Sequence, residues 1–423
     1  MHNRVVITGL GVVAPNGTGV PAFRQAIQQG ESGIRYDPRL EALQFSCCVA
    51  GEPVIPETLL QQYFDPLELR GLQCSSIVYG VIAGMEAWLH AGLPLTDTAD
   101  PDWESGVIFG AGSSGVDKIR DSIYKVDALQ IRKLGSTVVV QTMTSGVSAF
   151  LGGKLGLGNQ VSTNSAACTT GVESILMAYD RIRYGHATRM LAGSTGESGP
   201  YIWGGFDAMK VTTWKGNSQP AAASRPMSAS AAGIVPGSGA GALVLESLES
   251  ALARGATIYG EILGGHLNGG GQRNGGSMTA PNSMAVQRCI TTALNNAGVT
   301  PQEVDVINGH LTATGKDAAE IHNWCVALNR YGQDFPYLNA LKGMTGHCLS
   351  GSGAIELVSA VLQLHEGFLF PNINCEDLHP EIADLVAREK IPQQWRQQNI
   401  NILIKASFGF GDVNGCVVLK KYA

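Results

Sequence analysis

A single cysteine, Cys168, stands where a predicted strand turns into a predicted helix. Residues 161–171 begin with a short β-branched run, pass through small side chains to the cysteine and end at Gly171. Apolar residues then recur at the three- and four-residue spacing of a helix with one buried face, at Val172, Ile175, Leu176, Tyr179 and Ile182. Free backbone N–H groups and the dipole at a helix N-terminus stabilise a thiolate. The segment therefore predicts a cysteine nucleophile, although a lone cysteine among apolar residues is also a common small core residue.

Two histidines and a glycine-rich turn offer the other groups that acyl transfer at a cysteine would use. His310 ends the predicted strand 304–310, His347 ends the segment 339–347, and Phe408 lies in the turn 407–415. Histidine is the most frequent side chain in proton transfer and in hydrogen bonding to reacting groups. A histidine at a strand end is by itself more often structural, so the prediction rests on the combination with Cys168.

Taken in chain order, these segments resemble the β-ketoacyl synthase family, the elongating ketosynthases of fatty acid and polyketide assembly in the thiolase-like superfamily. The resemblance extends from residues 6–11 to residues 417–419. It implies an α/β fold of the thiolase-like five-layered αβαβα type, built from two pseudo-duplicated halves. We expect an N-terminal half over residues 1–255, which carries the nucleophilic cysteine, and a C-terminal half over residues 256–423, which carries both histidines.

The resemblance implies a decarboxylative Claisen condensation. Cys168 would take an acyl group from a carrier thioester, and His310 and His347 would donate hydrogen bonds to the malonyl thioester carbonyl as it becomes an enolate. The backbone N–H groups of Cys168 and Phe408 match the family's oxyanion hole, and the Phe408 side chain matches its gate between the acyl and malonyl stages. The reaction implies no metal and no organic cofactor.

Three other residues are interpreted through the same family resemblance. Lys342 and Glu320 match a lysine and a glutamate that stabilise the family's site electrostatically, and an ion pair that serves folding alone is the alternative. Cys416 invites comparison with the second cysteine of thiolases, but it lies in an apolar strand, so we interpret it as a core residue.

The implied partners are an acyl carrier protein, acyl and malonyl thioesters, and a second subunit, either a copy of this chain or a chain-length-factor paralogue. Carrier proteins are acidic, and of the basic residues that relatives place after the early Asp-Pro only Arg70 is present. Candidate replacements are Arg132, Lys133, Lys210, Lys215 and Arg273. Two other functions stay open: a non-catalytic chain-length-determining subunit, although such subunits lose the cysteine, and a CoA-dependent thiolase-like condensing enzyme.

Three departures from the family pattern favour a specialised polyketide, polyene or fatty acid ketosynthase over the housekeeping fatty acid enzyme. Leu311 stands where the family has a glycine after the first histidine. The charged residues that normally follow the segment 224–226 are missing, and Asp412 and Val413 replace a glycine and a threonine.

The composition excludes several classes of protein. The chain has 423 residues with 44% hydrophobic content, and its net charge of −6 gives no basic field for nucleic acid. Its nine cysteines have no paired spacing, which argues against a disulfide framework or a zinc site and favours a reducing cytoplasm. No stretch reaches the roughly 18 apolar residues of a membrane span. We therefore expect a cytoplasmic protein that binds neither nucleic acid nor membrane.

The elements that must position these side chains alternate between strands and helices, which indicates buried sheets covered by helices. A first strand is predicted to end in the glycine turn 9–11. Helices are predicted over residues 75–91, 283–297 and 353–364, and a hairpin is predicted from strands 401–405 and 415–419. The glycine-rich stretch 264–271 is predicted to be a flexible loop near the site.

Overall fold

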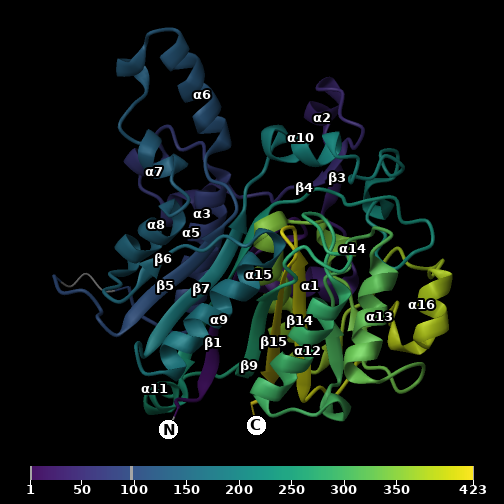
Figure 1. Ribbon diagram of the computed structural model, residues 1–423. Helices are drawn as coiled ribbons and strands as arrows, with labels where there is room; N and C mark the ends of the chain where they lie inside the picture. The colour runs from purple at the N-terminus through teal and green to yellow at the C-terminus, as the bar shows by residue number, and fades with distance from the viewer. Residues whose placement is uncertain (1, 96–98, 423) are drawn as a thin grey trace.

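The computed structural model describes residues 2–95 and 99–422 (Figure 1). Within these residues, one sheet of eleven strands runs through the chain in the order β11-β10-β14-β15-β9-β1-β8-β7-β5-β6, with β2 paired to β1. Two short two-stranded sheets, β12-β13 and β3-β4, lie outside it.

The N-terminal half of the sheet contains β1 (Val5–Ala14), β8 (Gly239–Ser247), β7 (Arg189–Gly196), β5 (Ser105–Ala111) and β6 (Val161–Ser162). Strand β8 is antiparallel to both β1 and β7, whereas β5 is parallel to both β7 and β6. The C-terminal half contains β9 (Gly260–Gly269), β15 (Val413–Lys420), β14 (Ile402–Gly409), β10 (Val306–Asn308) and β11 (Tyr337–Asn339).

The two half-sheets have the same topology. If the five strands of each half are numbered in chain order, both halves read 1-5-4-2-3 across the sheet. The directions also agree, because β15 is antiparallel to β9 and β14 while β10 is parallel to β14 and β11. The halves join where β1 pairs with β9, from Val5 opposite Ile262 to Ile7 opposite Gly260. This repeat confirms the pseudo-duplicated fold, and the boundary between residues 255 and 256 stays a prediction.

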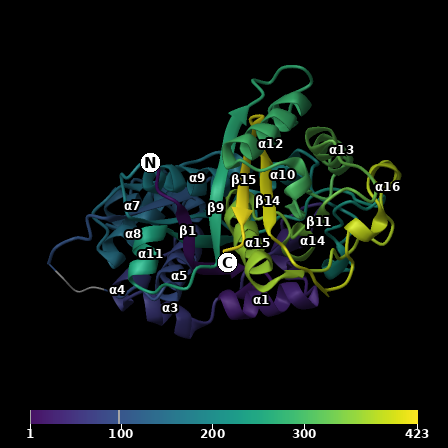
Figure 2. The same ribbon diagram turned by 90° about the horizontal axis from the view of Figure 1, so that it is seen from below.

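Five layers result from the way in which the helices pack (Figure 2). Helices α9 (Thr170–Arg183) and α15 (Ser352–Glu366) contact each other and both half-sheets, so they form the central layer. Helices α5 (Ser75–His90) and α8 (Gly146–Leu155) cover the N-terminal half-sheet, and α12 (Ser283–Ala297) covers the C-terminal one with α13 (Asp317–Leu328) packed against it. Every residue of α15 from Ser352 to Leu364 is buried, as a helix between two sheets requires.

Two predictions about glycine are wrong. The first strand continues through Gly9 and Gly11 to Ala14, because these glycines let helix α5 approach the strand: a Cβ on Gly11 would lie 1.9 Å from the carbonyl oxygen of Ala83. The stretch 264–271 is strand β9 as far as Gly269, and a Cβ on Gly265 would lie 2.5 Å from Leu176 of the central layer. In both places glycine permits close packing of a buried element rather than a turn.

The remaining elements are mostly short, and some of them carry site residues. They are β2 (Gly17–Thr18), α1 (Val20–Gln29), β3 (Ile34–Tyr36), α2 (Pro38–Ala42), β4 (Val49–Gly51), α3 (Glu57–Tyr63), α4 (Pro66–Leu69), α6 (Val116–Asp127), η1 (Ile131–Lys133), α7 (Val138–Thr142), η2 (Ala167–Thr169), α10 (Pro200–Ala208), η3 (Pro220–Ala222), α11 (Leu248–Ala253), η4 (Pro301–Glu303), α14 (Lys342–Thr345), η5 (Leu349–Gly351), β12 (Phe368–Leu369), α16 (Pro380–Leu385), η6 (Arg388–Lys390) and β13 (Arg396–Gln397). The segment from α6 to α7 projects from the N-terminal half (Figure 1). Among the described helices, none is long and apolar enough to cross a bilayer.

Candidate active site

The turn that follows β6 places Cys168 in η2, directly before α9. The preceding residue, Ala167, has φ +48°, a left-handed conformation that costs a residue with a side chain roughly 1–2 kcal/mol. The Thr170 hydroxyl fixes this turn, since it donates to the Ala167 carbonyl at 2.7 Å and accepts from the Ala166 N–H at 2.8 Å. The predicted position of the cysteine at a helix start is confirmed.

Two glycines bring this turn to the C-terminal half. A Cβ on Gly171 would lie 2.3 Å from the backbone nitrogen of Ala354, and a Cβ on Gly353 would lie 3.2 Å from that of Val172. The first turns of α9 and α15 therefore touch backbone to backbone, which only glycine allows. Because of this contact, the start of α9 faces the loops that carry the histidines.

Three neighbouring parallel strands deliver the other site residues. Strands β11, β10 and β14 run in the same direction, so their carboxyl ends meet at one edge of the sheet. His310 follows the end of β10, Lys342 follows the end of β11, and Phe408 lies near the end of β14. His347 follows α14, before the start of α15.

The thiol and the two imidazoles meet in one cluster. The sulfur of Cys168 and one ring nitrogen each of His310 and His347 lie within 4.8 Å of one another. The two rings are perpendicular at 5.5 Å between centroids, and both histidines are buried while Cys168 is half-buried. These donor types also suit zinc, and within the described residues no other group of His, Cys, Asp and Glu side chains is close enough to hold a metal ion.

The hydrogen-bond partners of the rings assign their tautomers. The N–H of Leu349 donates to Nδ1 of His347 at 3.0 Å, so that nitrogen is an acceptor and the proton of the neutral ring is on Nε2. The ammonium of Lys342, which can only donate, lies 3.4 Å from Nδ1 of His310 and assigns the same tautomer there. Both rings can therefore offer an Nε2–H to a bound carbonyl.

Burial sets the protonation states of the cluster. Burial first and the charge of Lys342 second hold the pKa of His310 and of His347 well below the ordinary value, so both rings are neutral at pH 7. Burial also raises the pKa of the Cys168 thiol, although Lys342 and the backbone N–H of Phe410 act in the opposite direction. The helix-stabilised thiolate expected from the sequence is thus outweighed by burial, and the resting group is a thiol.

Besides the backbone N–H of Cys168 itself, the one that faces the sulfur belongs to Phe410 rather than Phe408. Gly409 makes this contact possible, since a Cβ there would lie 3.2 Å from the backbone nitrogen of Cys168. The Phe408 ring is buried with its centroid 6.3 Å from that of His310, whereas Phe410 is less buried and its ring lies 6.1 Å from that of Phe206. Sequence reasoning missed Phe410, although the alternating Phe-Gly-Phe-Gly pattern offered both residues.

Lys342 and Glu320 both lie beside His310, but they are not partners of each other. Glu320 accepts the N–H groups of His310 at 2.7 Å and Leu311 at 2.8 Å, and burial raises its pKa to about 7. Lys342 donates to the carbonyl of His310 at 2.6 Å and pairs with Glu356 of α15. Sequence reasoning missed Glu356, although a carboxylate between the apolar residues Ile355 and Leu357 was a signal that could have identified it.

The turn after His310 explains how the chain tolerates Leu311. This residue has φ +27°, and its side chain is fully buried in the core of the C-terminal half. Asp317 accepts the N–H groups of Thr312 and Ala313, and together with Glu320 it holds the turn in place. Burial of the leucine side chain offsets the strain that a glycine would avoid.

Asp412, which stands where the family has a glycine, also has a structural role. Its fully buried carboxylate accepts the N–H groups of Gln272 at 2.9 Å and Asn282 at 2.8 Å, so it ties the loop 270–282 to the turn that carries Phe410. The N–H of Gly411 also donates to the carbonyl of Met278 at 2.8 Å. The loop predicted from the glycine-rich stretch therefore begins after β9 and is anchored beside the site.

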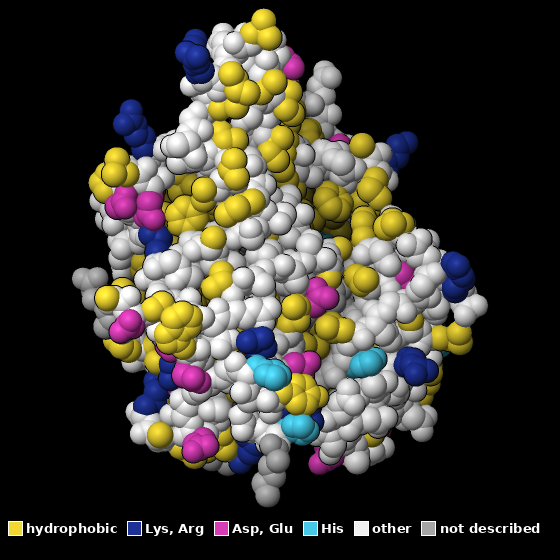
Figure 3. Space-filling model, turned by 60° about the vertical axis from the view of Figure 1, so that its left-hand side comes forward, with side chains coloured by type: hydrophobic (Ala, Val, Ile, Leu, Met, Phe, Trp, Pro, Cys, Tyr) yellow, Lys and Arg dark blue, Asp and Glu magenta, His cyan; other side chains and the backbone are white. Residues whose placement is uncertain are grey.

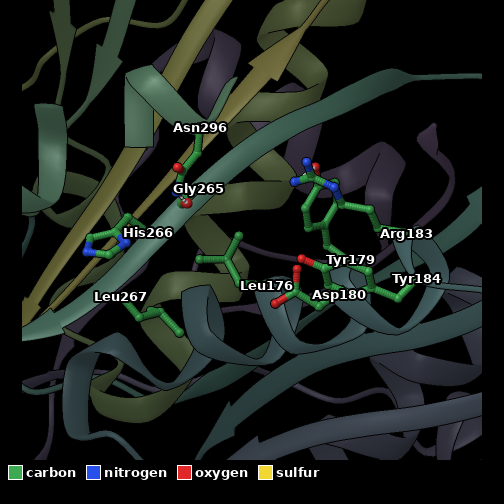
Figure 4. A pocket seen from close by; sticks show the side chains of 9 residues that line it. All are labelled: Leu176, Tyr179, Asp180, Arg183, Tyr184, Gly265, His266, Leu267 and Asn296. Atoms are coloured by element: carbon green, nitrogen blue, oxygen red, sulfur yellow. Dashed lines mark hydrogen bonds between the residues drawn. The ribbon is translucent and has the colours of Figure 1, made fainter. Parts of the chain in front are cut away.

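Two further features lie on the surface of the protein. A pocket of about 380 Å³ between α9, β9 and α12 is lined by groups such as Asp180, Arg183 and His266, and none of its lining residues belongs to the cysteine-histidine cluster (Figure 4).

Arg70 is exposed at the end of α4, as are all five candidate replacements in the carrier-docking prediction. Which of these cations meets a carrier stays a prediction.

The comparisons with known proteins agree with this geometry. The chain matches the N-terminal domain of β-ketoacyl synthases over residues 2–251 and the C-terminal domain over residues 259–376. It is 34% identical to the chloroplastic 3-oxoacyl-[acyl-carrier-protein] synthase I of Arabidopsis thaliana, covering 99% of this chain and 87% of that protein.

Solved structures of similar proteins extend over the full length. A type II polyketide ketosynthase in complex with its acyl-carrier protein is 27% identical with a TM-score of 0.86, and the match covers 100% of both chains. The ishigamide ketosynthase/chain length factor is 27% identical with a TM-score of 0.88, again over 100% of both chains. With its thiolase-like layers, its cysteine-histidine cluster and these full-length matches, the chain belongs to the β-ketoacyl synthase family of acyl-transferring condensing enzymes.

Proposed function

We propose that this chain is a β-ketoacyl-[acyl carrier protein] synthase that condenses an acyl group on Cys168 with malonyl-carrier protein. The observation that carries the proposal is the cluster in which the Cys168 sulfur and nitrogens of His310 and His347 lie within 4.8 Å of one another. It supplies a nucleophile and two neutral hydrogen-bond donors at one place, which are the groups that the two half-reactions need.

The first half-reaction loads the enzyme. The Cys168 sulfur attacks the acyl thioester, a carbon–sulfur bond forms to Cys168, and the bond to the carrier breaks. The thiol proton ends on the departing carrier thiol. We assign the oxyanion hole to the backbone N–H groups of Cys168 and Phe410, because the Phe410 N–H already faces the sulfur. Phe410 thereby takes the place in the site that the sequence assigned to Phe408.

The second half-reaction uses the histidines. Malonyl-carrier protein loses carbon dioxide, and the electron pair of the broken bond forms an enolate whose oxygen accepts hydrogen bonds from Nε2–H of His310 and His347. Donors aimed at developing charge typically contribute about 3 kcal/mol each. The enolate carbon then attacks the acyl-Cys168 carbonyl and expels the thiolate, which takes a proton from solvent. Neither step calls for a metal or an organic cofactor.

The carrier and the second subunit belong to the same proposal. One structural relative was solved with its acyl-carrier protein and another is a ketosynthase/chain length factor, which supports a carrier substrate and a paired subunit here. Apolar side chains gather over the projecting segment from α6 to α7 (Figure 3). Exposed ones include Ile119, Ile123, Leu129, Ile131 and Val139. We place a second ketosynthase-fold subunit on this surface, either a copy of this chain or a paralogue.

The departures at Leu311 and Asp412 lead us to place the enzyme in a specialised polyketide, polyene or fatty acid pathway. We also place it in the cytoplasm, where a reducing environment keeps the Cys168 thiol and the other free cysteines reduced.

Intact-mass analysis tests the proposed function directly. The wild-type enzyme is incubated with acyl-carrier protein or with acyl-CoA, and the mass gain of one acyl group is measured. We expect labelling from the carrier in the wild type and in the control variant Cys48→Ala, and none in Cys168→Ala. Faster labelling from acyl-CoA would favour a CoA-dependent condensing enzyme. Labelling of neither wild type nor variant would support a non-catalytic chain-length subunit and contradict the proposal.

A further inference from the structure

One carboxylate in the site is shared by two lysines. Glu356 of α15 pairs through Oε1 with Lys342 and through Oε2 with Lys405, whose ammonium lies 2.8 Å away. The three side chains are 0–2% exposed. The catalytic steps proposed above give Lys405 no role.

Lys405 lies within strand β14, among the buried apolar residues Leu403, Ile404 and Ala406. Its ammonium donates to the carbonyls of Gly309, at 3.5 Å, and Ala406. Gly309 directly precedes His310, so one side chain holds both Glu356 and the backbone that carries the histidine. Removing an ammonium from water costs several kcal/mol, and apolar residues often replace buried ion pairs without loss of stability. Stability alone is therefore a poor explanation for this lysine.

The charges around the two rings show what Lys405 adds. His310 is faced by Lys342 from α14, Lys405 from β14 and Glu320 from α13, with His347 and Cys168 beside it. Glu356 from α15 pairs with both lysines. Without Lys405, Glu356 would neutralise Lys342. With both lysines, the shared cluster keeps a net positive charge, which disfavours an imidazolium and favours an enolate. Lys405 acts in this direction on the pKa of both histidines.

We propose that Lys405 is a positioning residue for the condensation: it anchors the carboxylate oxygen of Glu356 that Lys342 does not hold, and it keeps His310 and His347 as neutral donors. The inference rests on the proposed function. It predicts that Lys405 matters for the histidine-dependent decarboxylation and much less for the acylation of Cys168, because acylation uses the sulfur and two backbone N–H groups.

The test measures the two half-reactions separately in Lys405→Met. Acylation of Cys168 is followed by intact mass, and decarboxylation of malonyl-carrier protein is followed by carbon dioxide release from pH 5 to pH 8. We expect an acylation rate within about threefold of wild type and a decarboxylation rate at pH 6 that is lowered about tenfold. The acid limb of the pH–rate profile for decarboxylation should move to higher pH. Equal losses in both half-reactions, or an acid limb that does not move, would show that the lysine serves folding alone.

A second variant and a spectroscopic readout keep the test sharp if Lys405→Met folds poorly. Lys405→Gln keeps a hydrogen-bond donor for Glu356 but removes the charge, so we expect the same shift of the acid limb. In ¹⁵N-histidine NMR spectra of either variant, the resonances of His310 and His347 should titrate at higher pH than in wild type. Lys420→Met, an exposed lysine at the end of the neighbouring strand β15, is the matched control and should leave all readouts unchanged.

Different results would contradict the proposed function and the proposed role of Lys405. If wild-type enzyme is not acylated and releases no carbon dioxide, the proposed function is wrong. If wild type does both, and the Lys405 variants keep its decarboxylation rate, acid limb and histidine titration, only the role of Lys405 is wrong.

Discussion

The ammonium nitrogen of Lys342 lies 2.6 Å from the backbone carbonyl oxygen of His310 and 3.4 Å from Nδ1 of the same residue. One lysine therefore holds both the peptide and the ring of a proposed catalytic histidine. Since the ammonium can only donate, it keeps Nδ1 as an acceptor and leaves the ring proton on Nε2. In the proposed mechanism, Lys342 thus orients a hydrogen-bond donor without being a donor to substrate itself.

Replacing Lys342 by methionine should slow decarboxylation more than acylation. Loss of a group that orients a metal-binding histidine costs about 10- to 100-fold in activity, and we expect the same range here for carbon dioxide release from malonyl-carrier protein. Lys154→Met removes an ion pair with Glu68 at the surface and should have no effect on either rate. An unchanged decarboxylation rate in Lys342→Met would show that His310 keeps its tautomer without the lysine.

Gly171→Ala should separate the two central helices. The added Cβ would lie 2.3 Å from the Ala354 nitrogen, and backbone cannot move aside as a flexible side chain can. We expect a loss of about 1–3 kcal/mol in the free energy of unfolding, together with slower acylation because Cys168 lies directly before the same helix. Gly153→Ala in α8 has no atom within 4 Å of the new Cβ and should leave stability unchanged or raise it. Urea denaturation of both variants distinguishes the two outcomes.

Leu311→Gly restores the glycine that the family has at this position. It tests whether backbone strain or burial of the leucine side chain has the larger effect on stability. Relief of the left-handed conformation is worth roughly 1–2 kcal/mol, whereas emptying a fully buried leucine site costs about 2–5 kcal/mol. We therefore expect the variant to be less stable than wild type in chemical denaturation. A more stable variant would mean that the surrounding core closes over the space.

Glu320 should give stability a pH dependence of known sign. Its pKa is raised from 4.5 to about 7, so the folded protein binds this proton more tightly than the unfolded chain does. The corresponding stabilisation is complete below pH 4.5 and is lost as the pH rises through 7, a change of about 3 kcal/mol. In urea denaturation at pH 4.5 and pH 8, wild type should lose this amount relative to Glu320→Gln. The histidines contribute equally to both proteins, so a difference that stays constant with pH would contradict the assignment.

The repeated strand-helix order and the positions of Cys168, His310 and His347 could be predicted from the sequence because local periodicity and short motifs encode them. The same signals predicted the two halves of the fold and a helix over residues 353–364, which corresponds to α15. Gly9 and Gly11 were misjudged because glycine marks either a turn or a close approach, and only the neighbouring helix α5 decides between them.

The partners within the site could not be predicted from the sequence. Glu356 and Lys405 meet Lys342 only after α15 and β14 pack together, so their pairing is a long-range property. The protonation of Cys168 was also misjudged, because the helix terminus is visible in the sequence whereas the burial that outweighs it is not.

The most direct test of the cysteine-histidine cluster removes either the cysteine or one histidine by mutation. Cys168→Ala and His347→Ala are each assayed for acylation by intact mass and for carbon dioxide release from malonyl-carrier protein. We predict that Cys168→Ala is not acylated yet still releases carbon dioxide, and that His347→Ala is acylated but releases carbon dioxide about 100- to 1,000-fold more slowly than wild type. If His347→Ala releases carbon dioxide at the wild-type rate, the histidine does not stabilise the enolate and the proposed mechanism is contradicted.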